Sequence, residues 1–102
     1  MNQLFLIGRL TEQPLLQKIN EKSRTTICLI VKRDFKNEIG VYSEDFIKCE
    51  LNGVIAERVC ECCKKNDLIS VKARVENLSD NAEEFNYKIV GKQVSFMQSQ
   101  SK

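Results

Sequence analysis

The first chemical signal in this sequence is an aromatic ring two positions before a lysine, Phe46 and Lys48, in the segment DFIKCELN. Side chains of a strand alternate between two faces, so Ile47, Cys49 and Leu51 would form an apolar face. Phe46 would then lie on the opposite, polar face, where a hydrophobic core does not require it. A large ring beside a cation on an exposed face indicates a partner that has flat faces and negative charge.

The sequence lacks the residues that enzymes most often use for catalysis. The chain contains no histidine, which removes the commonest general base, the commonest metal ligand and the usual partner of a serine or cysteine nucleophile. No other nucleophile–base pair and no constellation of carboxylates stands out. We therefore expect a protein that is not an enzyme and that uses no cofactor.

The five cysteines offer a rival site, because three of them crowd the segment CECC as Cys60, Cys62 and Cys63. A closed zinc site requires four ligands, usually as two separated pairs, and adjacent residues of a helix point about 100° apart. Cys28 and Cys49 fall on apolar faces of predicted strands. We expect buried cysteines and no metal, with a redox-sensitive Cys62 as the alternative.

Length and composition are those of one folded domain. The chain has 102 residues, of which 42% are hydrophobic and 29% charged, and a net charge of +2. The longest apolar run, Ile27 to Val31, is far shorter than the ~20 residues of a membrane span, and the N-terminus lacks the apolar length of a signal peptide. We expect a cytoplasmic protein that makes no contact with a membrane.

Hydrophobic periodicity predicts an all-β domain with a single helix. Strands are predicted at 3–10, 26–33, 45–51 and 68–75, with a final strand or strand pair at 85–97 broken near Gly91. Residues 18–26 should form a turn, and residues 34–44 a loop or, alternatively, a strand-flanked protrusion. Apolar residues spaced i, i+3, i+4, i+7 predict a helix over 54–65, with Lys64 and Lys65 in its last turn. Five strands with a helix between the third and fourth is the order of a Greek-key OB-fold barrel, although composition alone fits other small α+β barrels.

Several segments, in order, resemble the bacterial single-stranded DNA-binding proteins. The segments are NQLFLIGRLTEQPLL, VKRDFKN, EDFIKCEL, AERV followed by KKNDLISVKARV, and KIVGKQVSFM. The resemblance implies an OB-fold domain over residues 1–97, followed by a disordered end at 98–102. It also implies sequence-tolerant binding of single-stranded DNA in replication, recombination or repair, by a homo-oligomer, either a dimer or a tetramer.

The resemblance also implies which residues bind DNA. Bases stack on exposed aromatic rings of such domains while lysine and arginine neutralise phosphates. Phe35 and Phe46 match stacking positions of the family. The cations expected to neutralise phosphates are Arg9, Lys32, Arg33, Lys36, Lys48, Lys72 and Arg74. Tyr87 fits a further platform and a core position equally well.

The sequence departs from the family where Asn52 and Leu78 stand at positions that commonly carry aromatic rings. Asp80, Glu83 and Glu84 add negative charge to a loop. The sequence ends in Gln-Ser-Gln-Ser-Lys where the family usually continues to an acidic tip, so we expect no recruitment of replication enzymes by that route. Short, tail-less chains also resemble the primosomal replication protein derived from this family. The alternative function is therefore an OB-fold protein-interaction module, such as an accessory protein of a primosome or mobile element, with weak or lost DNA binding.

Overall fold

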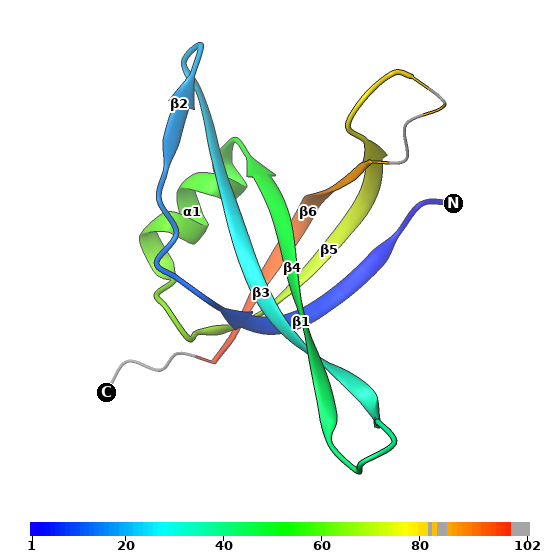
Figure 1. Ribbon diagram of the computed structural model, residues 1–102. Coiled ribbons are helices and arrows are strands. Elements are labelled where there is room, and N and C mark those ends of the chain that lie inside the picture. Colours follow the sequence, from blue (N-terminus) through cyan, green and yellow to red (C-terminus); the bar gives the residue numbers. More distant parts are fainter. Residues whose placement is uncertain (82, 84–85, 99–102) are drawn as a thin grey trace.

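Strands form most of this protein, whose computed structural model describes residues 1–81, 83 and 86–98 (Figure 1). The elements in chain order are β1 (Leu4–Leu10), β2 (Gln17–Ile19), β3 (Lys22–Lys36), β4 (Tyr42–Asn52), α1 (Val54–Cys62), β5 (Leu68–Asn77) and β6 (Tyr87–Gln98). β6 extends one residue into the predicted disordered end. Phe85, which was predicted to begin the last strand, and residues 99–102 lie outside the described residues.

The five long strands close into a barrel in the order β1-β5-β6-β4-β3, and β3 returns to β1. Neighbouring strands are antiparallel, except that β4 and β6 run parallel where Glu50 lies opposite Val90. The helix lies between β4 and β5, the third and fourth strands of the barrel. The predicted OB-fold barrel with one helix is therefore confirmed.

The barrel closes where Arg9 and Leu10 of β1 lie opposite Ile30 and Leu29 of β3. Gly8 permits this approach, because a Cβ at this position would lie 2.5 Å from the carbonyl oxygen of Ile30. No side chain fits at that distance from a backbone oxygen, so closure depends on a residue that has none.

One apolar core fills the barrel and the space beneath the helix. In β4 the predicted alternation is confirmed, since Cys49 and Leu51 are buried and Ile47 is half-buried, whereas Phe46 and Lys48 are exposed. The buried residues that form the core cluster are Leu6, Leu10, Ile27, Leu29, Cys49, Leu51, Ala56, Val59, Cys63, Ile69, Val71 and Ala73.

The helix is shorter than predicted. It begins after Gly53, whose φ of 67° lies in the left-handed region, and it ends at Cys62. Buried Asp67 ends it: its side chain accepts a hydrogen bond from the backbone N–H of Lys64 at 2.9 Å and so holds residues 64–67 in a turn. The prediction that Lys64 and Lys65 lie in the last helical turn is wrong.

The polar segment 18–26, predicted to be a turn, is instead a hairpin formed by β2 and the start of β3. Asn20 and Glu21 both have positive φ, 52° and 66°, and Ile19 lies opposite Lys22. Two residues with positive φ make the two-residue hairpin turn whose twist suits the flanking strands. The strand residues around it are exposed or polar, so no hydrophobic alternation marks them.

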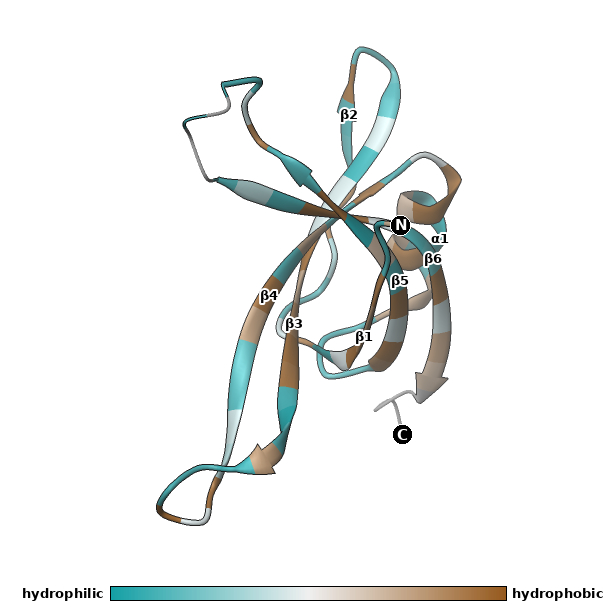
Figure 2. Ribbon diagram, turned by 90° about the vertical axis from the view of Figure 1, so that its right-hand side faces the viewer, coloured by the Kyte–Doolittle hydropathy of each residue, from teal (hydrophilic) through white to brown (hydrophobic). Residues whose placement is uncertain are grey.

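Residues 34–44 are the strand-flanked protrusion that was the predicted alternative to a loop. β3 continues to Lys36 and β4 begins at Tyr42, so only residues 37–41 form the connection. The Asn37 side chain accepts hydrogen bonds from the N–H groups of Ile39 and Val41, each at 3.0 Å. The resulting ribbon, which we call the β3–β4 arm (residues 32–45), projects away from the barrel (Figure 2).

The last strand is one continuous element with an irregularity near Gly91, which resolves the predicted choice between one strand and two. Lys72 pairs with Gln93, but Ala73 pairs with Gly91, so Lys92 is the extra residue of a bulge. The bulge lets β6 pair with β5 along its whole length while it also reaches β4.

Substituting Gly8 by alanine tests the closing contact. The added methyl group meets the backbone of Ile30, so we expect a loss of about 1–3 kcal/mol in the free energy of unfolding. Urea denaturation measures this loss, and Gln93→Ala at an exposed strand position is the control. Equal stability of the two variants would show that closure does not depend on Gly8.

Candidate nucleic-acid interface

The outward face of β4 carries Phe46 and Lys48, the aromatic ring and the cation that the sequence placed on an exposed face. Alternation along the strand places Tyr42, Phe46 and Lys48 on the side away from the core. The Phe46 side chain is 68% exposed and lies opposite Ile30 of β3. A ring this exposed, fixed on a strand of a closed barrel, is a preformed platform for a flat partner.

Phe46 borders a hollow of about 470 Å³ on the outer surface of the barrel. Tyr87, whose role the sequence left open, lines the same hollow and is 56% exposed, so it is a surface ring and not part of the core. Other side chains that line the hollow are Thr26, Lys48, Glu50, Leu78 and Lys88. Two rings and two lysines therefore converge on one depression, which we call the Phe46 hollow.

Tyr42 is a ring that the sequence-based prediction missed. The Nζ atoms of Lys36 and Lys32 lie 5.7 and 5.9 Å from the centroid of its ring. Tyr42 and Phe46 occupy the same face of β4, four residues or about 13 Å apart. The alternation that predicted Phe46 could have found Tyr42, had residues 34–44 not been predicted as a loop.

Phe35 lies apart from Phe46. It is 67% exposed and lines a different hollow, of about 770 Å³. The predicted Arg9 lines the same hollow, together with Phe5 and Ile7 of β1. Arg9 donates a hydrogen bond from Nη1 to the carbonyl oxygen of Asn66 at 3.0 Å. The two predicted stacking rings therefore do not share one hollow.

Two of the predicted phosphate-binding arginines already have carboxylate partners. Arg33 donates from Nε and Nη2 to Asp45 at 3.0 and 2.9 Å, and these bonds lower the pKa of Asp45. Arg74 pairs with Glu76. Within the part of the chain that the structure describes, Lys32, Lys36, Lys48 and Lys72 form no ion pair with a carboxylate.

Lys72 also stands away from the Phe46 hollow. It is half-buried on the outer face of β5 and lines a hollow of about 310 Å³ with Phe5, Ile7 and Gln93. The predicted cations therefore fall into separate groups, and only Lys48 lies in the hollow that Phe46 borders.

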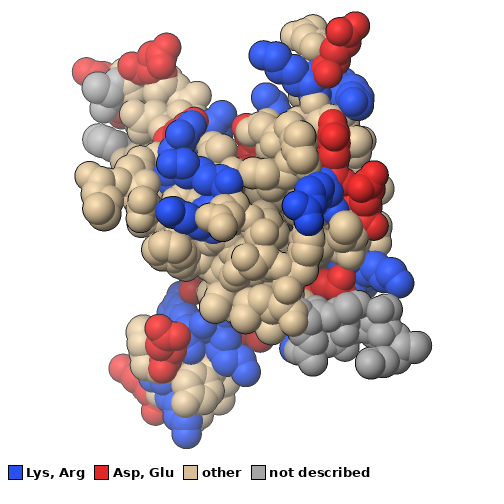
Figure 3. Space-filling view, turned by 180° about the vertical axis from the view of Figure 1, so that it is seen from behind, with Lys and Arg blue, Asp and Glu red and all other residues tan. Residues whose placement is uncertain are grey.

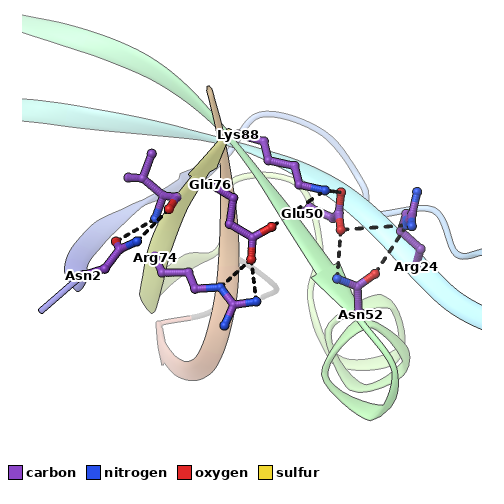
Figure 4. A network of polar contacts seen from close by, with 8 residues as sticks. Asn2, Arg24, Glu50, Asn52, Arg74, Glu76 and Lys88 are labelled. Atoms are coloured by element: carbon purple, nitrogen blue, oxygen red, sulfur yellow. Dashed lines mark hydrogen bonds and ion pairs between the residues drawn. The ribbon is translucent and has the colours of Figure 1, made fainter. Parts of the chain in front are cut away.

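A network of polar contacts crosses β3, β4, β6 and β5 next to the Phe46 hollow (Figure 4). Glu50 accepts a hydrogen bond from Asn52 at 2.9 Å, and it lies 3.6 Å from Lys88 and 4.0 Å from Arg24. The hydrogen bond from Asn52 is the main cause of a lowered pKa of Glu50, and the charges of Lys88 and Arg24 add to it. Sequence spacing gave no signal for these contacts.

Charge is distributed unevenly over the surface. Figure 3 shows basic and acidic side chains interspersed on the β3–β4 arm, and acidic side chains at the loop between β5 and β6. Of the acidic residues by which this loop differs from the family it resembles, Asp80 and Glu83 are exposed, and Glu84 lies outside the described residues. The arm has three cations (Lys32, Arg33 and Lys36) and four carboxylates (Asp34, Glu38, Glu44 and Asp45), so any attraction of a polyanion there depends on the placement of its lysines, whereas the loop repels it.

The cysteines form no metal site among residues 1–81, 83 and 86–98, where no cluster of three or more potential ligands occurs. Burial raises the pKa of the Cys49 and Cys63 thiols to about 11 each, which leaves them inert. Cys62 is exposed, as expected for a residue open to oxidation. No helix in the described part of the chain is long and apolar enough to cross a membrane.

Comparison with known proteins gives one consistent family. The family model described as "Single-strand binding protein family" matches residues 1–97. Single-stranded DNA-binding protein B of Bacillus subtilis (strain 168) is 34% identical over 84 residues, which cover 81% of this chain and 74% of that protein. Single-stranded DNA-binding protein 1 of Clostridium acetobutylicum is 30% identical over 104 residues, covering 96% of this chain and 94% of that protein.

A solved structure shares the fold. The crystal structure of the wild-type single-stranded DNA-binding protein from Thermus aquaticus superposes with a TM-score of 0.77 at 24% identity, covering 98% of this chain. This chain spans 52% of the length of that one, so it corresponds to about half of the Thermus protein.

The lowered pKa of Glu50 predicts a specific pH dependence of stability. Below the ordinary value of 4.5 the unfolded chain binds a proton that the folded chain still excludes, so this contribution is present above that pH and is lost as pH falls through the folded-state value. Urea denaturation between about pH 6 and about pH 3 should show a flatter decline for Glu50→Gln than for the unsubstituted protein. Parallel curves would contradict the assignment.

Proposed function

The chain belongs to the single-strand binding protein family, and on this premise we propose that it binds single-stranded DNA without catalysis and without reading its base sequence. The observation that supports this most is the exposed ring of Phe46 beside Lys48 on an outward barrel strand. Such a ring stacks on any base, and stacking contributes roughly 1–3 kcal/mol per base. Roles in replication, recombination or repair follow from single-stranded DNA as the ligand.

In this proposal the strand of DNA follows the outward face of β4 from the Phe46 hollow to the arm. Phe46 and Tyr87 stack bases in the hollow, and Tyr42 stacks a base on the arm. Lys48, Lys32 and Lys36 neutralise the phosphates between them, since their ammonium groups have no carboxylate partner among the described residues.

The remaining predicted residues take part differently. Phe35 stacks a base from the other side of the arm, near Arg9. Arg33 and Arg74 reach phosphate only by exchanging a carboxylate partner for it. Lys72 contacts the DNA only where the DNA continues past β1 and β5.

Several copies of the chain would extend this short site, and β1 offers a place for them to join. β1 pairs with β5 from Leu4 to Arg9 but with β3 only at Arg9 and Leu10, so its other edge is open over Leu4–Ile7 in the described structure. Phe5 and Ile7 are exposed beside that edge. An open strand edge beside apolar side chains favours pairing with a second copy. We expect a dimer, or a tetramer of two dimers.

One observation favours the alternative of a protein-interaction module. The ion pairs of Glu50 and Glu76 occupy cations on the same face, which weakens its attraction for phosphate. Phe46 would then be an anchor for a protein partner.

Titration of a fluorescent oligo-thymidine of about 35 nucleotides separates the two functions. DNA binding should weaken steeply between about 50 and about 200 mM salt. Phe46→Ala should lose roughly tenfold in affinity, because stacking on the ring is lost. Leu15→Ala removes an exposed apolar side chain that is distant from Phe46 in the sequence, and this control variant should bind normally. Absence of binding by the unsubstituted protein at the lower salt would favour the protein-interaction module.

A further inference from the structure

Two carboxylates hold three cations on the outward face of the barrel. Glu50 lies within ion-pair distance of Arg24 and Lys88, and Glu76 lies within ion-pair distance of Arg74 and Lys88. The side chain of Glu50 is only 17% exposed, because these partners surround it. The cations that would otherwise attract phosphate are thus neutralised in place.

Glu50 also stands between two hollows. It lines the Phe46 hollow, and it lines a second hollow of about 800 Å³ between the β2–β3 hairpin and the start of α1. The second hollow is lined by the cations Lys22 and Arg24 but also by the carboxylates Glu21, Glu50 and Glu57, and it has no aromatic ring. The Arg24–Asn52–Glu50 contacts form the boundary between the two.

We propose that Glu50 and Glu76 determine where the DNA-binding site ends: they hold Arg24, Lys88 and Arg74 away from phosphate and keep the strand out of the second hollow. This inference rests on the proposed function. It makes the two carboxylates residues that set the length and the salt dependence of the site through the cations that they hold.

The physical reason is competition between carboxylate and phosphate for the same cations. A phosphate that approaches Lys88 or Arg24 meets the negative charge of Glu50 and must displace it. An uncharged glutamine retains the hydrogen bond with Asn52 but no longer neutralises the cations. Removing the carboxylates therefore frees up to three cations for phosphate.

The test compares Glu50→Gln and Glu76→Gln with Glu61→Gln, which changes net charge equally at an exposed position of α1. The double variant is compared with a double control, Glu12→Gln with Glu61→Gln, in which both positions are exposed. Oligo-thymidines of increasing length are titrated at several salt concentrations. We expect the double variant to gain on the order of tenfold in affinity at low salt, with a salt slope steeper by about 0.7 for each freed cation. The number of nucleotides covered by each protein molecule should increase as well.

The outcomes separate the two proposals. Binding by the unsubstituted protein, with the glutamine variants of Glu50 and Glu76 no different from their controls, would overturn this inference and leave the proposed function intact. Absence of binding by the unsubstituted protein at low salt, with a folded protein by circular dichroism, would overturn the proposed function itself. Glu76→Gln keeps the test decisive if Glu50→Gln folds poorly.

Discussion

Closure of the barrel at the contact of β1 with β3 is the constraint on which the rest of the structure depends. Gly8 lets the two backbones meet, and the closed sheet then has an inside that is filled mainly by apolar side chains. Because strand side chains alternate, each buried residue of β4 obliges its neighbours to point outward. The outward position of Phe46 is thus a consequence of burying Cys49 and Leu51.

The same constraint explains what the sequence could and could not predict. Within the barrel, alternation is visible in the sequence, so β4, β5 and the outward position of Phe46 were predicted correctly. No residue of the β3–β4 arm is buried, so its paired strands carry polar residues on both faces. Its composition, with Asn37 and Gly40, resembles a loop, and Tyr42 was therefore missed. The β2–β3 hairpin was not predicted either, because the residues of β2 are exposed and show no hydrophobic alternation.

Electrostatic partners depend on register and could not be predicted. Glu50 meets Lys88 because β4 and β6 run parallel at one position, a pairing that no local sequence pattern signals. Arg33 meets Asp45 only because the arm is a paired ribbon. The sequence identified cations but could not show that they fall into separate groups, and it could not distinguish the arginines that pair with carboxylates from the lysines that have no carboxylate partner among the described residues.

The ion pairs of this face bear unequally on folding and on binding. Exposed pairs contribute only about 0–1 kcal/mol each to folding, since solvent screens them and side-chain order offsets their attraction. Toward a polyanion the same carboxylates act as competitors for the cations that phosphate requires. A network such as that of Glu50 and Glu76 can therefore change affinity for a charged strand more than it changes the stability of the barrel that carries it. The net charge of the chain is only +2, so the proposed binding of a polyanion depends on where the lysines without a carboxylate partner among the described residues lie, and not on the total charge.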